Sequence, residues 1–165
     1  MKCGINLYTI FKIGLFVYKS ILIPVDDQEQ SYSAVGVAGM MASCARAGVT
    51  LFHVRQPPEE VVTDIVTEDK LFSLPLKEHE SRMFARCLDI LSGYGIEPRV
   101  RLAESRNVAA RILKECRSGE YDVIVLGHRG RKTVKQLLLG SVANGVLVEA
   151  TCPVIMVPVP KADEG

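Results

Sequence analysis

The sequence predicts a single α/β domain with a doubly wound, parallel five-stranded sheet. Five short runs of apolar and β-branched residues alternate along the chain with four segments of helical periodicity. One of these runs, Tyr121–Leu126, ends in the continuously apolar stretch Val123–Leu126, which is typical of a strand buried on both faces. A chain of 165 residues suits one domain, and such a chain buries roughly 70% of the surface that it exposes when unfolded.

The amino-terminal half of this pattern begins with the β-branched run Ser20–Val25. Residues 26–31 then offer polar capping groups for a helix over Tyr32–Ala47, and Gly48 is its expected stop. Val49–Val54 is the second predicted strand, ended by a pair of prolines. Residues 57–76 combine prolines with mixed charges, which indicates an excursion over the surface.

The carboxyl-terminal half continues the alternation of helices and strands. Three helices are expected here, the second of them capped by Ser105, and three strands, the last with two prolines that suit a sheet edge. The first predicted helix is Glu78–Ser92 and the third is Ser141–Ala150. The second carries the apolar stripe Val108, Ile112, Leu113 and Cys116 and ends at Ser118-Gly119. The predicted strands are Glu97–Leu102, Tyr121–Leu126 and Pro153–Val159.

The charge balance argues against a nucleic-acid partner. Twenty basic and nineteen acidic residues leave a formal charge of +1, whereas a protein that binds nucleic acid usually carries a basic face. The one short basic cluster is Arg129, Arg131 and Lys132, where solvated loop charge and phosphate contact are the two interpretations.

The five cysteines are odd in number and widely dispersed, with no zinc-ligand spacing. They indicate a set of reduced thiols and a cytoplasmic protein. Cys44, Cys87 and Cys116 fall on apolar helical faces, where we expect small buried side chains.

Residues 1–18 form an apolar extension that precedes the predicted domain, 19–160, and its short polar tail, 161–165. The extension is interrupted by Lys12 and two glycines, which argues against a spanning helix, and it lacks the small residues of a signal-peptide cleavage site. We expect a strand or helix that packs on the domain or on a partner. Weak membrane association is the alternative left open.

A glycine-bearing loop follows the fourth predicted strand. Gly127, Gly130 and Gly140 are followed by Ser141 at the start of a helix. Glycine lets the backbone take positive φ and approach a ligand, so N–H groups can converge on phosphate oxygens next to the positive end of the helix. A purely structural turn is the alternative.

Ligands of doubly wound sheets bind at the carboxyl ends of the strands, where the strand order reverses. We expect the order 3-2-1-4-5, which makes strands one and four neighbours. Asp26 after strand one and Gly127 after strand four would then face one crevice.

From about Lys19 to Val159, the chain resembles the universal stress protein family, and specifically its ATP-binding branch. The family signature is glycine, two residues, glycine, nine residues, glycine and then serine or threonine, and Gly127, Gly130, Gly140 and Ser141 match it. The segments 23–26, His53-Val54, Tyr121-Asp122 and 138–142 also resemble the family. Asp27 and Gln28 depart from its usual glycine and serine at the entry to the first helix.

The resemblance implies a fold like that of the adenine nucleotide alpha-hydrolases and a bound ATP, with Mg or Mn bridging its phosphate oxygens. No catalytic residue and no metal ligand from the protein is predicted. The implied nucleotide contacts are the adenine pocket (Pro24, Val25, Asp26 and Val54), the ribose (Leu126 and Gly127), loop side chains near ribose or phosphates (His128 and Arg129), and the phosphates (Gly130, Gly140, Ser141 and Val142). Helix capping is the alternative role for Asp26.

The resemblance further implies a stress-response or regulatory dimer that depends on nucleotide, with little or no hydrolysis. Two other functions stay open: a slow ATPase or autophosphorylating protein, with Ser141 or Thr133 as acceptor, and a nucleotide-free dimeric scaffold. The homodimer is expected to form through the last strand, Val154–Val159, because self-pairing would satisfy its edge.

Overall fold

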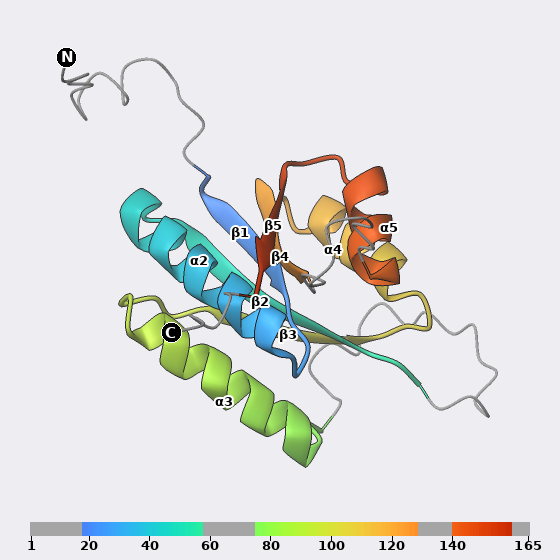
Figure 1. Ribbon diagram of the computed structural model, residues 1–165, viewed down its shortest axis with the longest axis horizontal. Helices are drawn as coiled ribbons and strands as arrows, with labels where there is room; N and C mark the ends of the chain where they lie inside the picture. Colours follow the sequence, from blue (N-terminus) through green and yellow to red (C-terminus); the bar gives the residue numbers. More distant parts are fainter. Residues whose placement is uncertain (1–17, 58–74, 129–139, 160–165) are drawn as a thin grey trace, which may run out of the picture.

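The computed structural model describes residues 18–57, 75–128 and 140–159. Strands and helices alternate through these ranges as the sequence predicts (Figure 1). Their bounds are β1 Ser20–Pro24, α2 Glu29–Ala45, β2 Gly48–Arg55, α3 Glu78–Ser92, β3 Arg99–Glu104, α4 Val108–Ser118, β4 Val123–His128, α5 Ser141–Glu149 and β5 Val154–Pro158.

The five strands form one sheet in the order β3-β2-β1-β4-β5, and every neighbouring pair is parallel. This confirms the predicted fold class and strand order. In the register, Ile23 of β1 lies opposite Leu51 of β2, and Ile21 lies opposite Val123 of β4. The strand order reverses between β1 and β4, so a crevice opens beyond their carboxyl ends.

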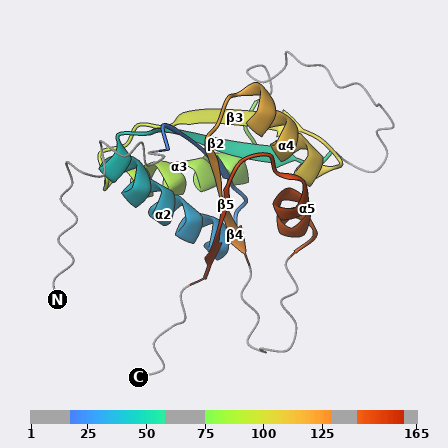
Figure 2. The same ribbon diagram turned by 90° about the horizontal axis from the view of Figure 1, so that it is seen from above.

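Two helices cover each face of the sheet, as Figures 1 and 2 show. Successive side chains of a strand point to opposite faces. Ile21 and Ile23 of β1 therefore pack in the core beneath α2 and α3, whereas Leu22 packs in the core beneath α4 and α5. All three are fully buried, which explains why the central strands read as unbroken apolar runs.

Helix α2 differs from its prediction at both ends. It begins at Glu29, because the Gln28 carbonyl accepts hydrogen bonds from the N–H groups of Ser31 and Tyr32. Apolar periodicity marks only the part of a helix that faces a core, so it missed this polar first turn. The helix ends at Ala45, with Arg46 in the left-handed conformation (φ 54°). Gly48 is therefore not the helix stop but the first residue of β2.

Two predicted boundaries, the cap of α4 and the limits of β3, also differ from those in the structure. The predicted cap was Ser105, but the N-cap is Asn107, whose side-chain oxygen accepts from the Ala110 N–H at 3.0 Å. The Ser105 hydroxyl instead supports Asn107, accepting from its N–H at 3.2 Å. Strand β3 runs over Arg99–Glu104, two residues later than predicted, because pairing with Thr50 to Arg55 of β2 decides its register.

The cysteine predictions hold on two helices and fail on one. Cys87 on α3 and Cys116 on α4 are buried, as expected. Cys44 on α2 is exposed, which contradicts the prediction. Position 44 lies about 200° around the helix from Ala42, so it points away from the sheet, which is contacted by the face formed by Ala34, Ala38 and Ala42.

The apolar extension over residues 1–17 and most of the excursion after β2 lie outside the described residues. The predictions made for them, and for the domain limits, stay predictions. None of the helices in the described ranges combines the length and the apolar character that crossing a bilayer requires.

Candidate functional site

A pocket of about 590 Å³ opens at the carboxyl ends of β1, β2 and β4. Its walls come from these strand ends and from the first turns of α2, α3, α4 and α5. The predicted site residues that line it are Pro24, Val25, Asp26, Val54, Leu126, Gly127, His128, Gly140, Ser141 and Val142. Arg129 and Gly130 lie outside the described residues. The topology thus brings together side chains that are more than a hundred positions apart in the sequence.

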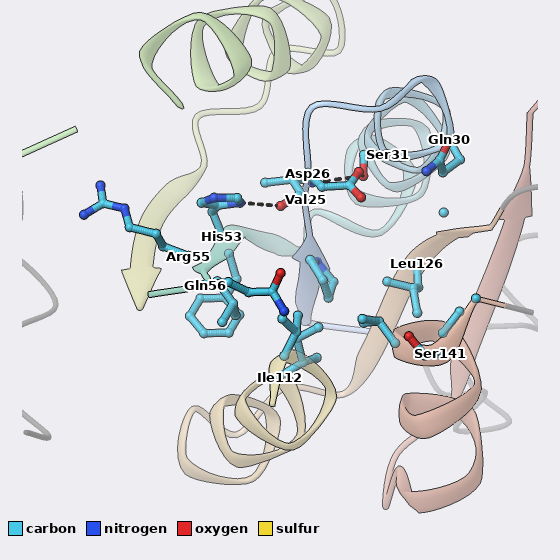
Figure 3. Close-up of a pocket in the computed structure, with 18 of the residues that line it drawn as sticks. Val25, Asp26, Gln30, Ser31, His53, Arg55, Gln56, Ile112, Leu126 and Ser141 are labelled. Atoms are coloured by element: carbon cyan, nitrogen blue, oxygen red, sulfur yellow. Dashed lines mark hydrogen bonds between the residues drawn. The ribbon is translucent and has the colours of Figure 1, made fainter. Parts of the chain in front are cut away.

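Asp26 meets the first turn of α2 through Ser31. The Ser31 hydroxyl donates to the Asp26 carboxylate at 2.5 Å and accepts from the Asp26 N–H at 3.1 Å (Figure 3). Asp26 is exposed and is not the helix cap, because Gln28 occupies the N-cap position. The serine therefore fixes the carboxylate at the pocket wall and leaves its other oxygen available to a ligand.

His53 lies on the same side of the pocket. Its Nδ1 lies 2.8 Å from the Val25 carbonyl oxygen (Figure 3). Its ring packs edge-on against Phe84, with 6.3 Å between the ring centroids. These contacts join the ends of β1 and β2. The hydrogen bond to Val25 spans 28 positions in the sequence, so the end of the neighbouring strand holds this histidine in place.

A buried ion pair between Arg55 and Glu80 forms the wall behind His53. Arg55 Nε donates to Glu80 Oε1 at 2.7 Å, and the second terminal nitrogen of Arg55 donates to Oε2. The Lys77 N–H also donates to Glu80 Oε2 at 2.8 Å, so the carboxylate caps the start of α3. The hydrogen bonds from Arg55 lower the pKa of Glu80 to about 2 although its side chain is fully buried.

Further contacts fix the guanidinium of Arg55. It reaches Glu104 of β3 at 3.2 Å and the Pro75 carbonyl oxygen at 3.1 Å. In Figure 3 it points away from the other labelled side chains of the pocket. A buried charge without a partner is very costly, so these partners hold the ends of β2 and β3 and the start of α3 in one arrangement.

Gly127 has a structural role that the sequence did not reveal. A Cβ there would lie 2.2 Å from the Gln30 carbonyl oxygen and 2.8 Å from the Ser31 nitrogen. Glycine is thus required because the first turn of α2 crosses β4 at this point, and the backbone does not take positive φ. Among the described glycines, positive φ occurs at Gly95.

Gly140 differs, because packing within the described chain does not require a glycine there. It is the N-cap of α5 with φ −55° and ψ 156°, angles that other residues also adopt, and no atom of the described residues lies within 4 Å of the position of a Cβ. Gly140, Ser141 and Val142 line the pocket, so the first turn of α5 presents N–H groups and the positive end of the helix dipole to it.

The middle of the pocket is apolar. Ile112 of α4 and Leu126 of β4 line this part of the pocket and are almost completely buried, and Val108 lines it as well. Figure 3 shows Gln56, Ile112, Leu126 and Ser141 around this part of the pocket, each from a different segment. An apolar wall flanked by a carboxylate on one side and by N–H groups on the other suits a flat ring system that carries an anionic tail.

The family model of the universal stress protein family matches residues 17–158. The chain belongs to the universal stress protein family. The match covers every described strand and helix, so the pocket is a feature of the universal stress protein domain itself.

Relatives of this universal stress protein include members from archaea and bacteria. A universal stress protein of Methanocaldococcus jannaschii is 29% identical over 157 residues, covering 95% of this chain and 92% of its own. One of Thermus aquaticus is 29% identical over 141 residues, covering 86% of this chain and 99% of its own.

Solved structures share the fold at lower identity. A universal stress protein of Archaeoglobus fulgidus superposes with a TM-score of 0.66 at 22% identity, covering 85% of this chain and 98% of its own. A universal stress protein in complex with cAMP has a TM-score of 0.62 at 16% identity, covering 87% and 98%. An Archaeoglobus fulgidus universal stress protein in complex with dAMP has a TM-score of 0.60 at 20% identity, covering 86% and 99%.

Sequence reasoning missed Ser31, Arg55 and Glu80 as residues of the pocket. Ser31 could have been suspected, because it is the first hydroxyl side chain after Asp26 in the sequence. The pairing of Arg55 with Glu80 spans 25 positions and a stretch of chain without clear periodicity. The usual capping-box signature would not reveal it, because Lys77 stands where serine or threonine is expected.

Proposed function

We propose that this universal stress protein binds an adenine nucleotide in the pocket at the carboxyl ends of β1, β2 and β4. The observation that carries the proposal is the arrangement of the pocket walls. An apolar middle at Ile112 and Leu126 separates the Asp26 carboxylate from the N–H groups at Gly140 and Ser141. The carboxylate and the apolar wall suit the polar edge and the flat faces of an adenine ring, and the N–H groups suit the phosphates of a nucleotide.

In this proposal Pro24, Asp26 and Val54 contact the base, and Leu126 with Gly127 flanks the ribose. Gly140, Ser141 and Val142 hold phosphate oxygens through their N–H groups and the serine hydroxyl. The bare N-cap at Gly140 supports this assignment, because nothing in the described chain contacts the space that a side chain would fill there. The cAMP and dAMP named for two solved family members support adenine as the base.

ATP is the proposed resident nucleotide, with Mg or Mn held through its phosphate oxygens. The described residues contain no group of three His, Cys, Asp or Glu side chains that could hold a metal ion. A divalent cation at this site would therefore depend on the phosphates for its ligands, as Mg commonly does. We propose a regulatory role, in which nucleotide occupancy changes shape or partners, within the cytoplasm.

Calorimetric titration of the purified protein with ATP, ADP, AMP and cAMP, each with and without Mg, tests the proposal. Gly140→Val is expected to weaken ATP binding tenfold or more, about 1.4 kcal/mol, because its side chain would enter the phosphate position. Gly36→Val on α2 is the matched control, since it also has no atom within 4 Å and lies away from the pocket lining. A folded wild-type protein that binds none of the nucleotides would overturn the proposal and favour a nucleotide-free scaffold.

Incubation with magnesium ATP distinguishes the regulatory role from catalysis. Efficient phosphoryl transfer needs a positioned base and a cationic clamp besides a phosphate cradle. We therefore expect recovery of intact ATP and no added phosphate by mass spectrometry. Steady release of ADP, or a phosphate on Ser141 or Thr133, would instead establish the slow ATPase or the autophosphorylating protein.

We further propose that two copies pair through β5. This strand lies at one end of the sheet and pairs with β4 on one side only, with Val154, Ile155 and Met156 half buried. A second β5 would complete the backbone hydrogen bonds of the open edge. Light scattering should give the mass of a dimer, and deletion of residues 1–17 shows whether the extension contributes. A monomer at micromolar concentration would contradict the pairing.

A further inference from the structure

Two cysteines lie in contact at the end of the sheet opposite the pocket, near the starts of β4 and β5. The Sγ atoms of Cys116 and Cys152 are 3.1 Å apart, although 36 positions separate the residues in the chain. Cys116 is in the last turn of α4, and Cys152 lies between α5 and β5. Both pack with the core beneath α4 and α5, in which Cys116 is buried and Cys152 is half buried.

The backbone on each side of this contact is fixed. The Cys116 carbonyl accepts from the Tyr121 N–H at 3.5 Å, which ties the end of α4 to the chain entering β4. The Pro153 carbonyl, next to Cys152, accepts from the Ile124 N–H of β4 at 3.0 Å. Both cysteines are therefore held against β4. A disulfide needs its sulfurs about 2.05 Å apart, so bond formation requires only a small closing movement of the two side chains.

We propose that Cys116 and Cys152 form a reversible disulfide, a modification site that is separate from nucleotide binding. In a reducing compartment such bonds are transient and serve redox sensing more often than permanent stabilisation. The oxidant is a low-molecular-weight disulfide. Its two sulfurs are reduced to thiols, the two protein thiols are oxidised to one disulfide, and the two protons from the cysteines end on the released thiols.

The exposure of the two thiols sets the order of the exchange. The half-buried Cys152 thiolate attacks the small disulfide first, giving a mixed disulfide and one released thiolate. Cys116 then attacks the Cys152 sulfur and displaces the second small thiol. Burial, followed by the contact with Cys152, raises the pKa of Cys116 to about 12, so Cys116 is a neutral thiol in the reduced protein and a poor first nucleophile.

The bond would close a covalent ring around the segment that carries the proposed phosphate site. Gly127, Gly140 and Ser141 all lie between the two cysteines in the sequence. Cross-linking restricts the unfolded chain more strongly as the enclosed loop lengthens. Oxidation is therefore expected to raise the midpoint of thermal unfolding by about 5–10 °C for a loop of this length.

Peptide mapping tests the bond directly. The full-length protein is equilibrated with oxidised glutathione at neutral pH, its remaining thiols are alkylated, and it is digested with trypsin. Cleavage after Lys and Arg places Cys116 in peptide 115–117 and Cys152 in peptide 136–161. We expect these two peptides to be recovered as one linked species that dithiothreitol separates. Their recovery only as singly alkylated or glutathionylated peptides would overturn the proposal.

Thermal unfolding supplies a second readout that does not depend on digestion. The melting difference between oxidised and reduced protein is expected in the wild type and in Cys44→Ser, because Cys44 is an exposed thiol of α2 outside the pair. It is expected to vanish in Cys152→Ser. Each variant is compared with itself in two redox states, so any loss of stability from the substitution cancels. An equal shift in Cys152→Ser, or no shift in the wild type, would contradict the bond.

Discussion

The two sides of the pocket are built differently. On the α3 side, which carries Asp26, Ser31, His53, Arg55 and Glu80, each of these polar side chains is hydrogen-bonded to another part of the chain at 2.5 to 3.2 Å. On the α5 side, formed by Gly140, Ser141 and Val142, the helix begins at a glycine without a side-chain cap. The first side is fixed by the chain itself, and the second presents backbone donors to the pocket. Substitutions on the α3 side should therefore change stability first, and those on the α5 side should change ligand affinity first.

The largest expected effect is on the α3 side. Glu80→Gln leaves the Arg55 guanidinium buried without its carboxylate, which is expected to lower the free energy of unfolding by about 3–5 kcal/mol. Urea denaturation at neutral pH measures the change. Glu78→Gln is the matched control, because its carboxylate pairs with Arg82 on an exposed surface and should change stability by about 0.5 kcal/mol or less. Equal losses in both variants would refute the contrast.

Acid should weaken the same side. The pKa of Glu80 is lowered from 4.5 to about 2 in the folded protein, chiefly by its hydrogen bonds to Arg55. A depressed pKa contributes stability that is complete above about pH 5 and is lost as the pH falls toward 2, about 3 kcal/mol in all. Urea titrations at pH 7, 5 and 3 should show this loss in the wild type and a shallower one in Glu80→Gln. Parallel pH profiles for the two proteins would show that Glu80 does not carry the effect.

The two glycines that border the pocket sharpen the comparison. Gly127→Ala should destabilise the fold by roughly 1–3 kcal/mol, because its Cβ would meet the backbone of Gln30 at 2.2 Å. Gly140→Ala should lower stability by about 0.5–1 kcal/mol, because alanine is a poorer N-cap than glycine, while no described atom lies within 4 Å of its Cβ position. Thermal unfolding of both variants separates them. A larger loss in Gly140→Ala would mean that packing, and not a ligand, requires that glycine.

A smaller effect than that of Gly127→Ala is expected for the hydroxyl that supports Asp26. Ser31→Ala removes the hydrogen bond to the carboxylate and the acceptor of the Asp26 N–H, which should lower stability by about 1 kcal/mol. Ser33→Ala is the control, because that hydroxyl is exposed and bonds only to the Glu29 carbonyl one turn back. If nucleotide binds at Asp26, Ser31→Ala should also weaken ATP binding severalfold in calorimetry, whereas Ser33→Ala should not.

The sequence was sufficient for the fold because the pattern of each element is local. Val123 to Leu126 is apolar without a break, and Gly119 and Gly140 mark the ends of neighbouring elements. The predicted boundaries were wrong where strand pairing or cap geometry decides them. Strand β3 takes its register from β2, and Asn107 rather than Ser105 caps α4 because its oxygen reaches the Ala110 N–H. Residue propensity alone contains neither the register of a partner strand nor the choice between two nearby polar caps.

The chain by itself therefore determined the alternation of strands and helices, the strand order and the segments that meet at the pocket. The alternation follows from the periodicity of apolar residues, and the strand order follows from the doubly wound topology that this alternation predicts. The segments that meet at the pocket follow from that topology and from the glycine pattern. Only the tertiary structure revealed the Arg55–Glu80 pair, the crossing of α2 over Gly127 and the contact between Cys116 and Cys152. Each of these joins residues that are 25 to about 100 positions apart, and such contacts depend on how packed elements meet in space, which no local pattern encodes.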